Sequence, residues 1–181
     1  MEIEKKLLNL ILEKPKLEDV LFLSARLEKI SNFMINKDIE QLRGIWELKW
    51  SSSNAAFLNP LPLVDNLQIL DPKNGNALNL LKPRGVKAII GTGIVAKINP
   101  IDNKRVGVKF THAGLIGPKI GFNKIKALAA IKKEQNGWLD ITYLSNNIRV
   151  CRGDKGTLFI LKKREDEKLF RRFKDFIFKF L

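Results

Sequence analysis

From Gly44 onward, apolar and polar residues alternate in short runs, and residues typical of turns close each run. In the first run, residues 45–50, the side chains of Trp46, Leu48 and Trp50 fall on one side. A period of two indicates a half-buried β-strand. Further predicted strands cover residues 64–70, 76–81, 86–90, 93–98, 105–111, 124–131, 138–144, 147–151 and 157–162.

The segments between these strands are rich in Gly, Pro, Asn and Asp, which favour tight turns. The predicted turns lie at residues 71–75, 99–103, 136–137, 145–146 and 153–156. Eight or nine short strands joined in this way predict an antiparallel barrel or sandwich. Closing the sheet into a barrel also hides its edges.

Helical periodicity flanks the strands on both sides. Residues 3–14 and 17–33 carry apolar residues at helical spacing, and Pro15 separates the two predicted helices. We therefore expect one structural domain with three parts. These are a helical cap over residues 1–41, a barrel over residues 42–163 and a basic amphipathic helix over residues 164–181.

The predicted C-terminal helix has phenylalanines on one side and cations on the other, as an interfacial membrane helix does. Alternatively, its aromatic side packs on the barrel, or it docks there in solution and is released at a membrane. The residues expected to meet the membrane are Phe170, Arg171, Arg172, Phe173, Lys174, Phe176, Ile177, Lys179 and Phe180.

The net charge of +14 is concentrated in the middle of the chain, because residues 84–133 hold eleven Lys or Arg and one acid, Asp102. Such a field favours an anionic partner, either lipid headgroups or nucleic acid, although a basic surface can also serve solubility alone. Barrels that bind nucleic acid place aromatic residues among the cations. Here the segment has only Phe110 and Phe122, so nucleic acid is the weaker alternative. A protein partner at this basic face is a further alternative.

The residues that could carry catalysis are few. The chain has one histidine, His112, and one cysteine, Cys151, which the strand pattern does not place together, and no metal-ligand spacing. We therefore predict that the protein is not an enzyme and holds no metal. One cysteine also agrees with a reducing compartment. Residues 1–6 lack the layout of a secretion signal or a transit peptide.

Two stretches resemble the plastid lipid-associated proteins, also called plastid fibrillins. Residues 42–53, LRGIWELKWSSS, are similar to the family's entry strand, with its Gly-x-Trp and hydroxyl cluster. Residues 137–144 and 148–161 are similar to the closing hairpin, with Arg-x-x-Arg-Gly-Asp-x-Gly at its turn. Including the helices before them, the resemblance covers most of residues 18–162.

This resemblance implies a mainly β, lipocalin-like antiparallel barrel that binds an apolar lipid or isoprenoid-type molecule without catalysis. It implies a peripheral protein of photosynthetic membranes with a structural or photoprotective role. We expect a cyanobacterial-type member on the cytoplasmic side of the thylakoid. No cofactor is required; a lipid, carotenoid or quinone is the candidate ligand. The alternative is a lipocalin-type chromophore lyase or chaperone, which needs a nucleophile or acid inside the barrel mouth.

The barrel-closing residues are expected around Trp46. Gly44 lets the chain turn so that the Trp46 ring plugs the barrel floor, and Arg149 or Arg152 lies over this ring, as a cation–π contact of about 1 kcal/mol. Gly153 and Gly156 supply backbone freedom for the last turn, and Asp154 bonds its amides.

The candidate cavity-lining residues are mostly aromatic. Asp140 either faces solvent or anchors a polar headgroup. Small residues in the middle strands, among them Gly91, Gly93 and Ala96, either leave room for a ligand or allow tight strand coiling. The candidate ligand-binding residues are Trp50, Phe57, Phe110, Asp140, Tyr143 and Phe159.

Overall fold

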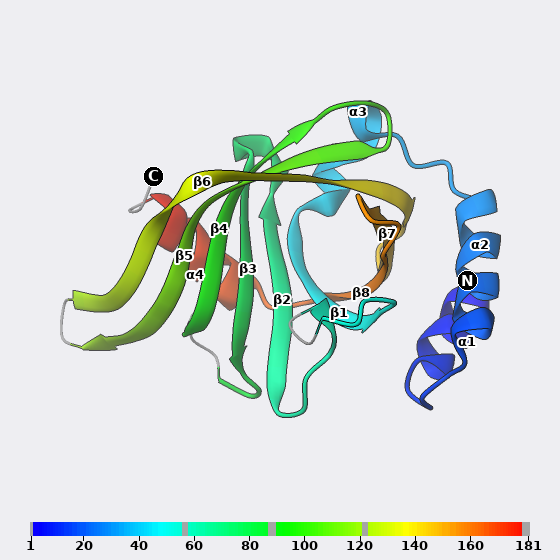
Figure 1. Cartoon of the computed structure of the whole chain (residues 1–181), viewed down its shortest axis with the longest axis horizontal. Coiled ribbons are helices and arrows are strands. Elements are labelled where there is room, and N and C mark those ends of the chain that lie inside the picture. Colours follow the sequence, from blue (N-terminus) through cyan, green and yellow to red (C-terminus); the bar gives the residue numbers. More distant parts are fainter. Residues whose placement is uncertain (1, 56–57, 87–89, 121–122, 179–181) are drawn as a thin grey trace.

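The computed structural model describes residues 2–55, 58–86, 90–120 and 123–178 (Figure 1). Its eight strands in this part of the chain are β1 (Gly44–Ser51), β2 (Val64–Asp71), β3 (Asn76–Pro83), β4 (Gly91–Pro100), β5 (Arg105–Ile120), β6 (Asn123–Leu144), β7 (Ile148–Gly153) and β8 (Leu158–Arg164). The helices are α1 (Glu2–Leu10), α2 (Leu17–Lys29), α3 (Ile35–Asp38) and α4 (Glu167–Phe178), with short 3-10 turns η1 (Ile39–Leu42) and η3 (Pro72–Asn74).

The strands form a closed barrel in sequence order. Each strand pairs antiparallel with the next, and β8 returns to pair with β1, where Trp46 lies opposite Lys163. Closure leaves neither β1 nor β8 as a free edge. The predicted mainly β fold, an antiparallel barrel of about eight strands with helices at both ends of the chain, is therefore confirmed.

Three predicted strand boundaries are wrong, the first because β5 continues to Ile120 and does not end at residue 111. The Asn136-Gly137 pair does not form a turn: it lies inside β6, where Gly137 is opposite Val108 of β5. The two strands predicted at 124–131 and 138–144 are thus one long strand, which forms with β5 the hairpin extending from the barrel in Figure 1. Before β4, Val86 belongs to a turn, donating its amide hydrogen to the Pro83 carbonyl, and residues 87–89 lie outside the described residues.

Glycines allow the close approach of β4 and β5 to their neighbours. Gly91 has φ +131°, and a Cβ atom there would lie 2.0 Å from the Leu81 carbonyl oxygen. Gly114 has φ +152°, and a Cβ atom would lie equally close to the Ala127 carbonyl oxygen. At Gly91 the tight-coiling interpretation of the small residues therefore agrees with the structure, and Gly114 shows the same feature at a position that was not predicted.

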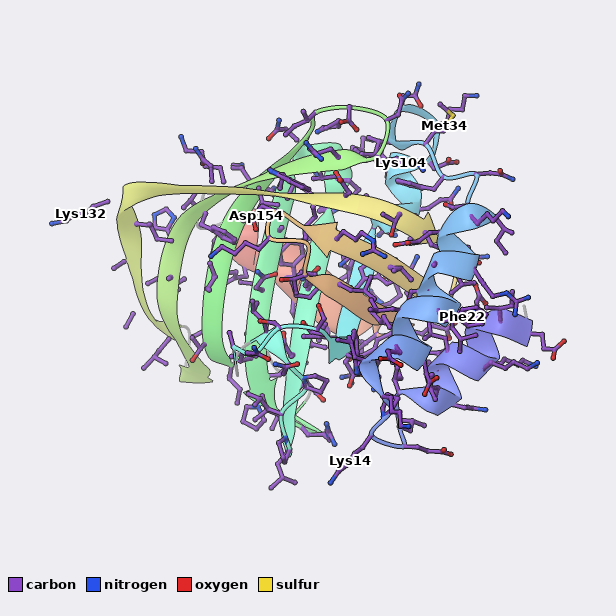
Figure 2. All side chains as sticks on the ribbon, turned by 45° about the vertical axis from the view of Figure 1, so that its right-hand side comes forward. Lys14, Phe22, Met34, Lys104, Lys132 and Asp154 are labelled. Carbon is purple, nitrogen blue, oxygen red and sulfur yellow. The ribbon has the colours of Figure 1, made fainter. Side chains whose placement is uncertain are left out.

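The two N-terminal helices cover the outer wall of β6–β8. Leu7 of α1, Ile11 directly after it, and Val20 and Leu27 of α2 form one apolar cluster with outward residues of these strands. Figure 2 shows this helical pair in front of the barrel, with Phe22 on its outer side. Phe22 is 63% exposed, so the pair retains apolar surface of its own. The strand residues of the cluster are Tyr143, Ile148, Val150, Leu158 and Ile160.

The C-terminal helix α4 packs on a different part of the outer wall. Phe170, Phe173 and Phe176 are buried in a cluster with outward residues of β1–β5. Arg171, Arg172 and Lys174 are exposed. The structure thus shows the packing alternative for this helix, with its aromatic side against the barrel. The Ile177 side chain, Lys179 and Phe180 lie outside what is described. No described helix is long and apolar enough to span a bilayer.

Candidate functional site

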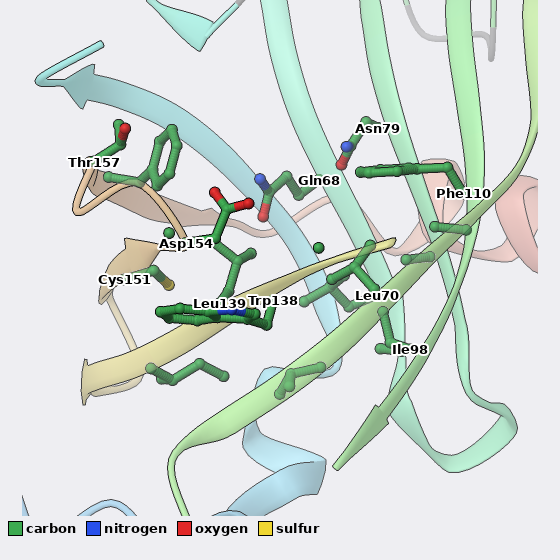
Figure 3. Close-up of a pocket in the computed structure, with 18 of the residues that line it drawn as sticks. Gln68, Leu70, Asn79, Ile98, Phe110, Trp138, Leu139, Cys151, Asp154 and Thr157 are labelled. Carbon is green, nitrogen blue, oxygen red and sulfur yellow. The ribbon is translucent and has the colours of Figure 1, made fainter. Parts of the chain in front are cut away.

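A cavity of about 420 Å³ lies inside the barrel (Figure 3). This volume is in the range of small-molecule sites in proteins. All strands except β1 contribute to its wall, together with the loop between β7 and β8. Its lining residues are Leu42, Leu58, Gln68, Leu70, Ala77, Asn79, Ala96, Ile98, Val106, Val108, Phe110, Asn136, Gly137, Trp138, Leu139, Ile141, Arg149, Cys151, Gly153, Asp154, Lys155, Thr157 and Phe159.

The cavity exists partly because small residues occupy inward positions. Ala77 and Ala96 face each other across β3 and β4, and both line the cavity. Larger side chains at this pair would fill the space. Ala96 thus lies where a small side chain leaves space inside the barrel, and its use by a ligand stays a prediction.

Trp46 of β1 lies in a buried cluster with Leu42 and Leu48, outside the lining of the cavity. Its side chain is fully buried, and its indole Nε1 donates a hydrogen bond to the Leu42 carbonyl oxygen at 2.8 Å. The Arg149 Cζ atom lies 5.0 Å from the ring centroid, and the Lys163 Nζ atom 5.1 Å. Burial, followed by the positive charges of Arg43 and Arg149, lowers the pKa of Lys163.

Arg149 and Cys151 bring two titratable groups to the cavity wall. Arg149 is 2% exposed and donates through Nη2 to the Gln68 side-chain oxygen. Burial lowers the pKa of Arg149, yet a guanidinium remains charged at any physiological pH. Burial also raises the pKa of the Cys151 thiol, although the nearby Arg149 opposes this shift. Cys151 is therefore a neutral thiol and a poor nucleophile.

Two of the predicted ligand-binding residues, Phe110 and Phe159, lie on the cavity wall. Trp50 and Tyr143 do not, and that expectation is corrected: both pack outside the barrel with the cluster under α1 and α2. The reason is a register shift in each strand, between Leu48 and Trp50 in β1 and at Tyr143 in β6. A bulge inserts one residue and so reverses which face the following residue occupies. Phe57 lies outside the described residues.

Asp140 is also placed away from the cavity lining. It receives two hydrogen bonds from Arg105 of β5, Nε to Oδ1 at 2.7 Å and Nη2 to Oδ2 at 2.9 Å. The same guanidinium stacks on Trp138, with Cζ 3.6 Å from the ring centroid. Asp140 thus orients Arg105 against the outer side of a cavity-lining tryptophan, and the expected role as a headgroup anchor is corrected.

The turn between β7 and β8 differs in detail from the expectation. Backbone bonds close it, with the Gly153 amide donating to the Thr157 carbonyl and the Gly156 amide to the Gly153 carbonyl. Gly156 has φ +71°, so its predicted backbone freedom is used. Asp154 does not bond the turn amides in the structure; its side chain points toward the cavity in Figure 3.

Arg152, the other candidate for the Trp46 ring, has a different partner. Its guanidinium makes two hydrogen bonds to the Glu28 carboxylate, at 2.8 and 2.9 Å. This pair ties α2 to β7. Arg149 alone of the two predicted arginines lies over Trp46.

Several cavity residues were not anticipated from the sequence. The most informative are Trp138, Gln68 and Asn79, which are among the lining residues labelled in Figure 3. Gln68 of β2 and Asn79 of β3 have the parity of inward residues, which is a usable signal once the strand register is known. Trp138 of β6 has the opposite parity, that of Asp140, so alternation gives no signal for it. The polar groups of these three residues give a mainly apolar wall several places for hydrogen bonds, together with the other polar lining residues Asn136, Arg149, Asp154, Lys155 and Thr157.

The described residues show no ready catalytic constellation. Cys151 lines the cavity, whereas His112 of β5 is not among the lining residues. No group of three or more His, Cys, Asp or Glu side chains in the described part of the chain could hold a metal ion.

A protein-family model described as PAP_fibrillin matches residues 5–162 of the chain. Over 32 residues the chain is 59% identical to "Probable plastid-lipid-associated protein 12, chloroplastic" of Arabidopsis thaliana. That segment is 17% of this chain and only 8% of the length of the Arabidopsis protein. No solved structure matches the chain significantly.

Proposed function

Since the chain belongs to the PAP_fibrillin family, whose model matches residues 5–162, we propose that its barrel binds one apolar lipid or isoprenoid-type molecule. The observation that carries this proposal is the cavity of about 420 Å³ within the closed barrel. Aliphatic and aromatic side chains form most of its wall, and burial of apolar ligand surface there is favourable by about 25 cal/mol per Å².

The protein acts, in this proposal, at the surface of a photosynthetic membrane. The support is its positive charge together with the exposed cations of α4, Arg171, Arg172 and Lys174, which suit anionic headgroups. Because the phenylalanines of α4 are buried, this contact is electrostatic and weakens with salt. The thylakoid of a cyanobacterium, and a structural or photoprotective role, are the setting we propose.

Organic extraction of the purified protein followed by mass spectrometry tests ligand binding directly. The expected result is a stoichiometric apolar molecule, such as a lipid, carotenoid or quinone. Extracts that contain no such molecule, together with no binding of added candidates, would contradict the proposal.

A matched pair of variants on β5 tests whether the ligand occupies this cavity. Val108 lines the cavity, whereas the neighbouring Lys109 is exposed on the other face of the strand. Val108→Trp should fill the cavity and lower the bound fraction at least tenfold. Lys109→Trp adds the same ring outside and should leave binding unchanged.

Nucleic-acid binding is the alternative that the net charge of +14 keeps open. Co-sedimentation with anionic and neutral vesicles, run beside a nucleic-acid shift assay at the same salt concentration, separates the two. Binding to anionic vesicles alone supports the membrane proposal, and binding to nucleic acid alone refutes it.

A further inference from the structure

The guanidinium of Arg149 is a buried charge without a negative partner. The residue is 2% exposed, and its Nε atom has no hydrogen-bond partner. No carboxylate of the described residues lies within 4.0 Å of it, although other buried or half-buried cations, such as Lys82 and Arg152, have one. An isolated buried charge is costly, so proteins normally pair such groups.

The neighbours of Arg149 do not supply the missing charge. Gln68, which accepts its hydrogen bond, is neutral. Cys151 is the nearest acid, but burial raises the pKa of its thiol and keeps it protonated. Arg149 also acts on Lys163, a cation that adds to the positive charge. Asp140 acts on Cys151, but this carboxylate is paired with Arg105.

The Trp46 ring stabilises the positive charge of Arg149 but does not supply the missing hydrogen-bond acceptor. The Arg149 Cζ atom lies 5.0 Å from the ring centroid, which makes a cation–π contact. The ring carries no carboxylate or carbonyl oxygen, and Nε remains without a hydrogen-bond acceptor. A free in-plane donor on a buried cation therefore requires an acceptor.

Arg149 lines the cavity, so this acceptor can come from a bound molecule. The two other ionised groups of the cavity wall, Asp154 and Lys155, are exposed and of opposite sign. Among the charged residues of the cavity wall, Arg149 is thus the buried one, and a bound ligand would lie beside it. A carboxylate matches the planar, forked geometry of a guanidinium and neutralises one positive charge.

We propose that the cavity is selective for a single-chain amphiphile with a carboxylate head, which Arg149 binds while the apolar tail occupies the rest of the space. This inference rests on the proposed function, because it presupposes an apolar ligand in the cavity. It adds the chemical class of that ligand and names the residue that selects it.

The test compares a long-chain carboxylic acid with the alcohol of the same chain length, by calorimetric titration of the full-length protein stripped of bound lipid. A hydrogen bond between charged groups is expected to favour the acid by about 10- to 100-fold. Arg149→Met should remove this preference while the affinity for the alcohol persists. Lys162→Met, which removes an exposed cation of β8 outside the cavity lining, is the matched control and should keep the preference.

The outcomes separate this inference from the function on which it rests. Equal affinity of the wild-type protein for acid and alcohol overturns the role of Arg149 and leaves an apolar cavity. Binding of neither ligand overturns both proposals. If Arg149→Met does not fold, the wild-type comparison still decides. Arg149→Lys, which keeps the charge but loses the forked geometry, should then reduce the preference without abolishing it.

Discussion

Removing the Phe173 ring measures how firmly α4 is held on the barrel. Phe173 is fully buried, and its ring centroid lies 5.9 Å from that of Phe170. Truncating a buried phenylalanine to alanine costs about 3–5 kcal/mol, from lost burial and the cavity that remains. A typical domain has only about 5–15 kcal/mol of stability, so Phe173→Ala should consume a large part of it.

Equilibrium unfolding in urea, followed by tryptophan fluorescence, is the assay. With a slope of about 2 kcal/mol per M, the expected loss lowers the unfolding midpoint by roughly 1.5–2.5 M. Arg171→Ala is the control, because Arg171 is exposed on the same helix and its removal should change stability by less than about 0.5 kcal/mol.

The same two variants separate the two roles expected of α4. If the helix is mainly a membrane element, Phe173→Ala will unfold at the same urea concentration as Arg171→Ala and lose vesicle binding instead. That result would refute the reasoning from burial. Under the packing seen in the structure, Arg171→Ala is the variant that weakens vesicle binding, at low salt only.

Three further predictions concern other parts of the fold. Burial and the hydrogen bond to Glu4 raise the pKa of Tyr143 to about 12. The tyrosinate absorbance of this single tyrosine should therefore appear near pH 12 in the folded protein. The stability that this raised pKa contributes is complete below the ordinary tyrosine pKa and should be lost as the pH rises through the folded-state pKa of about 12. Glu4→Gln should lower the pH at which the tyrosinate absorbance appears. Burial alone would raise the pKa of Asp65, but the hydrogen bonds and positive charges of Arg164 and Lys82 outweigh burial, so this pKa is lowered. Urea unfolding at several pH values should thus show stability that is present above the ordinary aspartate pKa and lost in acid, a loss that Asp65→Asn abolishes. Gly91→Ala should lower the thermal midpoint by several degrees, whereas Gly137→Ala, which meets no atom within 4 Å, should not.

The strand pattern was predictable because alternation is a local property. Each run of inward and outward residues depends on whether its own strand is half buried, and the closed order β1–β8 follows from a series of hairpins. The Arg149–Trp46 contact was expected from the resemblance of the two terminal stretches of the barrel, with Arg152 left as an equal choice. The structure decides between them through Glu28 of α2, a residue distant in sequence from both.

Strand length was less accessible from the sequence. Asn136-Gly137 has the composition of a turn, yet Gly137 pairs with Val108 because β5 continues beside it. A turn residue inside a strand costs only a few tenths to about 1 kcal/mol, which cross-strand pairing over a long hairpin exceeds. Such pairing partners are separated along the chain, so the local composition does not reveal them.

The positions of the aromatic residues show why the cavity itself could not be predicted. Simple alternation from Trp46 and Leu48 places Trp50 inside the barrel, and alternation from Ile141 places Tyr143 inside as well. Register shifts in β1 and β6 turn both rings outward, where they pack beneath α1 and α2. Each ring buries about 150–250 Å² of surface, so two more rings inside would occupy much of the space that a ligand needs. The two bulges therefore both attach the N-terminal helices and leave the barrel hollow, and a shift of one residue in either strand would exchange a binding cavity for a filled core.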